Sequence, residues 1–211
     1  MIQLYHCRET RSLRPLWALE EMGVPYEPVL LPFPPRALAR EYLDINPIGT
    51  IPFLVDGEVR MTESTAICLY LTTRYGPTLL ALSPDEPDYP LFLNWLFYSD
   101  ATLTFPQTIV LRYRHLEAPE KRAQQPAADY EKWFNGRLRA VESALADREW
   151  LCAGRFTIAD IAIAYALYLA DRIVGLGANF GPHVRAYLER ACARPEFQRA
   201  SIVDAQAPAW R

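Results

Sequence analysis

The first third of the chain places its apolar residues at two alternating periods. Short apolar runs of strand length cover residues 2–6 and 25–31. Between them, residues 12–22 carry apolar side chains at helical spacing and are followed by a glycine, which is typical of a helix end. Residues 36–43 predict a further short helix before an Asn-Pro pair. The opening pattern is therefore strand, helix, strand and short helix.

A proline and a tight turn organise the segment that follows. Pro52 cannot donate a strand hydrogen bond, so it marks the start of a strand, where the cis isomer of an X-Pro bond is common. Asp56-Gly57 predicts a turn into a second strand, and residues 64–75 predict a helix with one buried face. A β-α-β unit followed by β-β-α is the thioredoxin-like arrangement, with a parallel crossover and then an antiparallel hairpin.

The pattern beyond residue 90 is helical throughout. Residues 77–90 are rich in proline and acidic residues and form the natural linker. Pro106 should kink the helix that contains it, because it removes one backbone hydrogen bond. We therefore expect an α/β plus all-α fold class, with a thioredoxin-like domain over 1–76, the linker over 77–90 and an all-helical domain over 91–211. The expected helices of the second domain are residues 91–114, 127–146, 157–174 and 182–193, with a short segment from Pro195.

Charge and composition argue against several classes of partner. The 211 residues carry a net charge of −3, which favours neither nucleic acid nor an anionic membrane as partner. No segment approaches the roughly 18 uninterrupted apolar residues of a membrane span, so we expect a soluble, cytoplasmic protein. The four cysteines have no metal-type spacing, the three histidines are scattered, and no nucleotide-binding motif occurs. We expect buried free thiols and no metal.

The region around Pro52 and residues 64–75 is a candidate binding site. The residue before Pro52 would offer its backbone N–H and C=O to a ligand. Ser64 can cap the helix that follows, and the free N–H groups of that helix start attract a carboxylate. This combination suits a small acidic peptide, although a proline-initiated strand and a capped helix also occur in many folds without a ligand.

Two separated segments give the chain a family resemblance. Residues 48–67, with Pro52 and Glu63-Ser64, resemble the glutathione-binding half of the cytosolic glutathione S-transferases, in which a cis-proline loop and a Glu-Ser pair hold the tripeptide. Residues 150–160 look like the N-capping box and hydrophobic staple of that family's C-terminal domain, with Thr157 and Asp160 as the box. The resemblance covers essentially the whole chain and implies glutathione as co-substrate.

The resemblance also implies roles for individual residues. The γ-glutamyl end of glutathione would meet Glu63 and Ser64, and the cysteinyl main chain would pair with the backbone of Ile51. An acidic residue of the neighbouring subunit of a homodimer, Asp100, would help to bind the ammonium group. The complete set of expected glutathione-binding residues is Arg36, Thr50, Ile51, Pro52, Glu63, Ser64 and Asp100.

The group that acts on the glutathione sulfur is expected in the loop after the first strand. Beta-class transferases, which the chain resembles most, carry Cys-Ser where this chain has Arg11-Ser12, so the cysteine is absent. Ser12 is the first candidate, Thr10 is the second, and Arg11 could favour the thiolate as a cation. Alternatively, Ser12 only caps its helix. Thr104 stands where the beta class has a histidine, and Cys7 is the less favoured redox alternative.

The resemblance predicts a glutathione transferase that conjugates the thiolate to small hydrophobic electrophiles in detoxification. Aromatic residues, chiefly Tyr98, Phe105 and Tyr113, could line the electrophile pocket between the domains. Two alternatives stay open from the sequence: a glutathione-dependent isomerase of the maleyl type, and a non-catalytic binding module that retains the fold.

Overall fold

The computed structural model describes residues 1–210, which form two compact units. The first unit comprises Met1–Ala81 together with the C-terminal segment that starts at Cys192, and the second comprises Leu82–Ala191. The expected division had assigned everything after residue 90 to the second domain. The C-terminal segment belongs instead with the first unit, and the reason is the packing of its helix.

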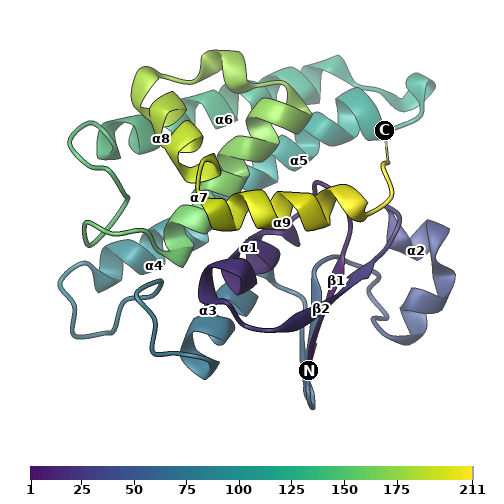
Figure 1. Cartoon of the computed structure of the whole chain (residues 1–211). Helices are drawn as coiled ribbons and strands as arrows, with labels where there is room; N and C mark the ends of the chain where they lie inside the picture. The colour runs from purple at the N-terminus through teal and green to yellow at the C-terminus, as the bar shows by residue number, and fades with distance from the viewer. Residues whose placement is uncertain (211) are drawn as a thin grey trace. The chain divides into compact units, whose positions relative to one another are not determined.

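The first unit is built on a four-stranded sheet with the order β2-β1-β3-β4. β1 and β2 lie side by side and parallel (Figure 1), whereas β1 with β3 and β3 with β4 are antiparallel. This is the thioredoxin-like arrangement predicted from the sequence. The strands are β1 (Ile2–His6), β2 (Tyr26–Leu30), β3 (Phe53–Asp56) and β4 (Val59–Met61).

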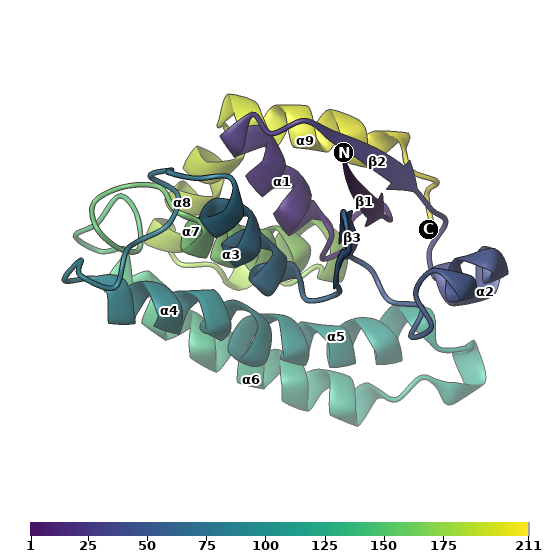
Figure 2. The same ribbon diagram turned by 90° about the horizontal axis from the view of Figure 1, so that it is seen from below.

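Three helices of the first unit follow from apolar stripes in the sequence. They are α1 (Leu13–Met22), α3 (Ser64–Arg74) and α9 (Pro195–Gln206). Figure 2 shows α9 running beside α1, and the rings of Trp17 and Phe197 meet edge-on at 4.7 Å between centroids. Burial of two large aromatic side chains in one contact supplies a strong apolar driving force. α9 is therefore part of the first unit, and it is longer than the short segment expected from Pro195.

The predicted helix over residues 36–43 is two shorter pieces. α2 (Pro35–Leu38) is followed by a 3₁₀ turn, Arg40–Asp44. Ala39 lies between them with φ −140° and ψ 70°, outside the helical region, so the hydrogen-bond ladder is broken there. The periodicity of the apolar residues continues across this break, which explains why the sequence predicts one helix.

The second unit is helical, as predicted. The expected first helix is divided into α4 (Tyr89–Tyr98), a π-helical segment (Ser99–Thr104), α5 (Phe105–Leu111) and a second π-helical segment (Arg112–Leu116). Pro106 lies in the first turn of α5, where the missing N–H leaves no interior bond unmade. The interruption thus falls just before the proline. The remaining helices are α6 (Gln124–Ala144), α7 (Ile158–Tyr168), with a π-helical extension, and α8 (Pro182–Cys192).

The start of α7 is a capping box, as predicted. The Thr157 hydroxyl accepts from the first turn of the helix, and the Asp160 carboxylate accepts from the backbone N–H of Thr157 at 2.8 Å. Asp160 is fully buried and also accepts from the Leu151 N–H and the Tyr187 hydroxyl, each at 3.0 Å. Burial raises the pKa of Asp160 to about 6, although these hydrogen bonds oppose the shift. Asp160 therefore has a structural role, because its carboxyl group connects the start of α7 to Leu151 and Tyr187.

Apolar burial in the second unit is concentrated on α7. Every residue from Ile158 to Leu167 is buried, so this helix forms the core of the unit. No helix among residues 1–210 is long and apolar enough to cross a membrane.

Candidate active site

The loop between β1 and α1 brings two candidate hydroxyls together. Thr10 Oγ1 lies 2.8 Å from Ser12 Oγ and donates to the carbonyl of Cys7 at 2.8 Å. Ser12 is fully buried, and its hydroxyl makes no cap on α1; it lies 2.8 Å from Nδ1 of His6. The interpretation of Ser12 as a simple helix cap is therefore wrong. Thr10 is only half-buried, so of the two hydroxyls it is the one on the accessible side.

His6 connects this loop to the C-terminal helix. Its ring is completely buried at the end of β1, with Nε2 3.1 Å from Oδ1 of Asp204 on α9. These atoms are not aligned as a full hydrogen bond, so the contact is chiefly electrostatic. Asp204 Oδ1 also accepts from the N–H of Glu9 at 2.8 Å, and Glu9 has a left-handed φ of 58°. The carboxylate therefore holds a backbone conformation that non-glycine residues seldom adopt.

The backbone before β3 is held by two buried polar side chains. The carbonyl of Thr50 accepts from the Tyr42 hydroxyl at 2.8 Å and from Asn46 Nδ2 at 3.0 Å. The Ile51–Pro52 peptide bond is cis, as predicted, and Pro52 is buried immediately before β3. The hydrogen bonds from Tyr42 and Asn46 therefore hold the backbone at the strand start expected to bind glutathione.

Gly49 brings Arg36 close to this segment. Gly49 has a φ of 60°, and a Cβ atom there would lie 2.7 Å from Cβ of Arg36 and 2.9 Å from Leu43. Only glycine fits both the conformation and the approach. The exposed side chain of Arg36, one of the expected glutathione-binding residues, therefore starts beside the loop of Thr50 and Ile51.

The start of α3 differs from the expected cap. Glu63 is the N-cap residue by its backbone, and Ser64 is the first helical residue, so Ser64 does not cap the helix. The Ser64 hydroxyl instead accepts from Nη1 of Arg14 at 3.0 Å. Arg14 is fully buried on α1 and brings a positive charge behind the N-terminus of α3. Glu63 is exposed beside it. The buried cation and the helix dipole each place positive charge at this end of α3.

The aromatic candidates of the second unit are not gathered at one cavity. The Tyr98 hydroxyl donates to the carbonyl of Arg137 on α6 at 3.0 Å, and the Phe105 ring packs on Tyr130 of the same helix at 5.9 Å. Tyr113 follows Phe105 by about 12 Å along the helix. The remaining expected residue, Asp100, is half-buried in the π-helical segment after α4.

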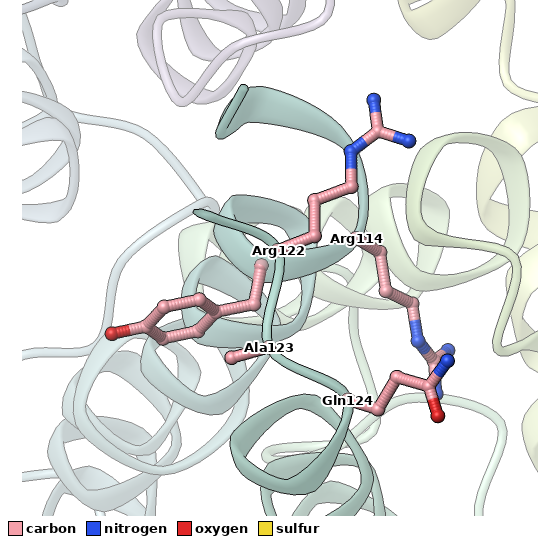
Figure 3. Close-up of a pocket in the computed structure, with 5 residues that line it drawn as sticks. Arg114, Arg122, Ala123 and Gln124 are labelled. Atoms are coloured by element: carbon pink, nitrogen blue, oxygen red, sulfur yellow. The ribbon is translucent and has the colours of Figure 1, made fainter. Parts of the chain in front are cut away.

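Tyr113 instead lines a cavity of about 420 Å³ within the second unit. Its other lining residues are Arg114, Arg122, Ala123 and Gln124. Figure 3 shows the side chains of Arg114 and Arg122 pointing in different directions, and Arg114 is ion-paired with Glu131. The two guanidinium groups therefore do not converge on one ligand position. The hydroxyl of Thr104 is also buried in this unit, where it donates a hydrogen bond to the carbonyl of Ser99 at 2.7 Å.

Cys7 has the properties of a structural thiol. It is fully buried, and Sγ donates to the carbonyl of Pro32 at 3.5 Å. Burial raises its pKa to about 12, so the thiol is protonated at neutral pH and is a poor nucleophile. This agrees with the preference for a hydroxyl rather than Cys7 as the group that acts on sulfur.

Comparison with known proteins defines the family. The family model for the glutathione S-transferase N-terminal domain matches residues 1–73, and that for the C-terminal domain matches residues 134–190. The chain is 31% identical over 161 residues to the glutathione S-transferase GstA of Escherichia coli O157:H7, covering 76% of each chain. It is 29% identical over 210 residues to the maleylacetoacetate isomerase of Pseudomonas aeruginosa, covering 94% of this chain and 95% of the relative.

A solved structure agrees with these matches. Ure2p in complex with glutathione superposes with a TM-score of 0.82 at 25% identity, over 95% of this chain and 92% of that chain. A thioredoxin-like unit combined with a helical unit is the architecture of glutathione-dependent transferases. The chain belongs to the glutathione S-transferase family, and the expected enzyme class, glutathione transferase, is confirmed.

Several polar residues of the site, among them Arg14, Tyr42, His6 and Asp204, were not selected from the sequence. Arg14 falls within the apolar stripe of α1, and Tyr42 looks like an ordinary core aromatic residue. His6 was grouped with the scattered histidines. Asp204 lies 192 residues beyond Ser12, and no local pattern connects the two. Only the arginine left a sequence signal, namely a charge at an otherwise buried position of a predicted helix.

Proposed function

We propose that the chain binds glutathione along the edge formed by Thr50, Ile51 and Pro52 and by the start of α3. The γ-glutamyl carboxylate meets the hydroxyl and backbone N–H of Ser64, and Glu63 faces the ammonium group. The cysteinyl main chain pairs with the backbone of Ile51, as in strand addition to a sheet. Arg36 receives the glycine carboxylate, since its side chain starts beside this loop.

One observation carries this assignment: the 3.0 Å hydrogen bond from buried Arg14 to Ser64 Oγ. Because Arg14 donates to that oxygen, the Ser64 proton is free to donate outward to a carboxylate. The guanidinium charge and the α3 N-terminus both favour an anion at this place. A serine that capped its own helix would have its oxygen committed to the first turn instead.

The chemistry that follows is attack of the glutathione thiolate on a small hydrophobic electrophile. The sulfur forms a C–S bond, and the leaving group departs with its electron pair or, in an addition, the electrophile takes up a proton. We propose that Thr10 donates to the thiolate, because it is the less buried hydroxyl of the loop. The buried Ser12 hydroxyl, 2.8 Å from that of Thr10, holds the Thr10 hydroxyl in place, and Arg11 adds positive charge to the loop.

Binding calorimetry with the Ser64→Ala variant tests the glutathione site. The loss of a hydrogen bond to a charged group should weaken glutathione binding by about 1–3 kcal/mol. Thr72→Val is the matched control, because it removes a buried hydroxyl from the same helix that donates only to the Leu69 carbonyl. Equal affinity of the parent and Ser64→Ala proteins would refute the assignment.

A second candidate reaction is a glutathione-dependent isomerisation of the maleyl type. It is favoured by one observation, the match to a maleylacetoacetate isomerase over nearly the whole length of both chains. In this reaction the thiolate adds to a double bond, the adduct rotates, and the thiolate leaves again, so glutathione is regenerated. Assays of a maleyl substrate and of a chloro-dinitro aromatic electrophile, with glutathione consumption followed in both, separate the two reactions.

We further propose a cytoplasmic homodimer in which Asp100 of the partner subunit approaches the glutathione ammonium group. The resemblance to the family supports this arrangement. Light scattering of the purified protein measures the assembly, and Asp100→Asn should weaken glutathione binding without changing the mass of the particle.

A further inference from the structure

A chain of four polar groups runs from the accessible side of the site loop into the core of the first unit. Thr10 Oγ1 is 2.8 Å from Ser12 Oγ, Ser12 Oγ is 2.8 Å from His6 Nδ1, and His6 Nε2 is 3.1 Å from Asp204 Oδ1. Thr10 is half-buried, Ser12 and His6 are fully buried, and Asp204 is 6% exposed. The series therefore has one end near solvent and three members in the interior.

The acceptor at the inner end sets the direction of the protons. A carboxylate only accepts, so in the neutral ring the nitrogen that faces Asp204, Nε2, carries the hydrogen. Nδ1 is then the acceptor, and the Ser12 hydroxyl donates to it. Thr10 has two acceptors within 2.8 Å, the Cys7 carbonyl and Ser12 Oγ, so a rotation of its hydroxyl aligns all the donors inward.

We propose that this chain is a proton relay in which His6, backed by Asp204, takes the proton of bound glutathione through Ser12 and Thr10. The inference rests on the proposed function, in which Thr10 contacts the sulfur. Thr10 is then the catalytic residue, whereas Ser12, His6 and Asp204 are positioning residues that act through it.

The step balances in protons and charge. The S–H bond breaks and its electron pair stays on sulfur, while Thr10 accepts that proton and passes its own to Ser12. Ser12 passes its own proton to Nδ1 of His6. A neutral thiol and a neutral imidazole thus become a thiolate and an imidazolium, and the Asp204 carboxylate lies 3.1 Å from the new positive charge.

The transfer also reverses the direction of the hydroxyls. The imidazolium donates to Ser12, Ser12 donates to Thr10, and Thr10 donates to the thiolate that the relay has produced. The group that removes the proton therefore ends as the group that stabilises the anion. After the C–S bond has formed, the proton returns along the same path to the leaving group, to the carbanion of an addition, or to water.

Nitrogen-15 NMR of the histidine-labelled enzyme tests the relay directly. The chain has three histidines, so His115→Gln and His183→Gln variants assign the His6 resonances. Glutathione should move the Nδ1 resonance of His6 to the position of a protonated nitrogen. S-methylglutathione has no thiol proton and should leave it in place. A purely structural role for His6 predicts the same response to both ligands, and that result would overturn the relay.

Two variants extend the test to the thiol. Ser12→Ala removes the middle of the relay, and Asp204→Asn keeps an oxygen for the Glu9 N–H but removes the charge. Each should lower the thiolate fraction of bound glutathione about tenfold at neutral pH, measured by ultraviolet absorbance, which corresponds to one unit in the apparent pKa of the thiol. Thr72→Val is again the control and should leave this fraction unchanged.

The outcomes separate the relay from the proposed function. Calorimetry that shows no binding of glutathione or S-methylglutathione refutes the glutathione site and, with it, the relay. Binding of both ligands with an unchanged His6 resonance, or with an unchanged thiolate fraction in both variants, refutes only the relay. If Ser12→Ala fails to fold, the isosteric Asp204→Asn variant and the NMR comparison of the two ligands still decide the question.

Discussion

Replacement of Asp160 by alanine probes how a buried carboxylate stabilises the second unit. Its oxygens accept from the backbone N–H groups of Leu151 and Thr157 and from the hydroxyls of Thr157 and Tyr187. Loss of the helix cap costs ~1 kcal/mol, and leaving buried donors without an acceptor costs ~1–3 kcal/mol each, with partial relaxation. We therefore expect Asp160→Ala to cost ~3–5 kcal/mol when the parent carboxyl is neutral.

Ionisation of the buried Asp160 carboxyl group lowers the stability of the native protein as the pH rises. Its pKa is raised from 3.8 to about 6 by burial, so the native protein holds this proton more tightly than the unfolded chain. The native state binds more protons between these two values, so its stability falls as the pH rises from about 4 to about 6. The full displacement is equivalent to ~3 kcal/mol at neutral pH. The cost of Asp160→Ala should therefore shrink to ~0–2 kcal/mol at pH 7.

Urea unfolding followed by tryptophan fluorescence, at pH 4.5 and pH 7, measures both quantities. Asp129→Ala is the control, because Asp129 is an exposed carboxylate on α6 whose replacement should change the stability by less than about 0.5 kcal/mol. A variant that is destabilised more at pH 7 than at pH 4.5 would refute the reasoning, since it would mean that the donors around Asp160 outweigh its burial. Glutathione affinity in folded Asp160→Ala should stay near that of the parent.

Two further predictions concern the first unit. Gly49→Ala should destabilise the protein by ~2–4 kcal/mol in urea unfolding, because φ is 60° and the new methyl group meets Arg36; Gly57→Ala, with a similar φ and open space, should cost only ~1 kcal/mol. In native protein at pH 8, iodoacetamide should modify the half-buried Cys192 before Cys7, whose pKa is about 12; mass spectrometry that finds Cys7 alkylated first contradicts its assignment as a structural thiol.

The parts of the fold that the sequence predicts well are those controlled by neighbouring residues. The period of apolar residues in α1 and the capping box at Thr157 are local signals, and both appear in the structure. The break at Ala39 was not predictable in this way. A change in the backbone of one residue interrupts a helix without any change in its apolar pattern.

The same distinction explains the errors at the candidate site. Ser12 and Ser64 both precede or begin helices, and local preference makes each a cap, but each hydroxyl instead bonds to a residue from another segment, His6 and Arg14 respectively. A serine hydroxyl has several partners of similar energy, and tertiary contacts choose among them. The backbone segment proposed to receive glutathione is thus a local prediction, whereas the hydrogen bonds that support it depend on the whole first unit.

The return of α9 to the first unit has a consequence for the order in which the protein is made. His6, Glu9 and Ser12 leave the ribosome before the second unit, whereas Asp204, which contacts His6 and Glu9, leaves it after that unit. The second unit is synthesised completely in the interval, and domains generally fold as units once they have emerged. The site loop, although translated first, can therefore reach its final geometry only after the helical unit and α9 have been translated.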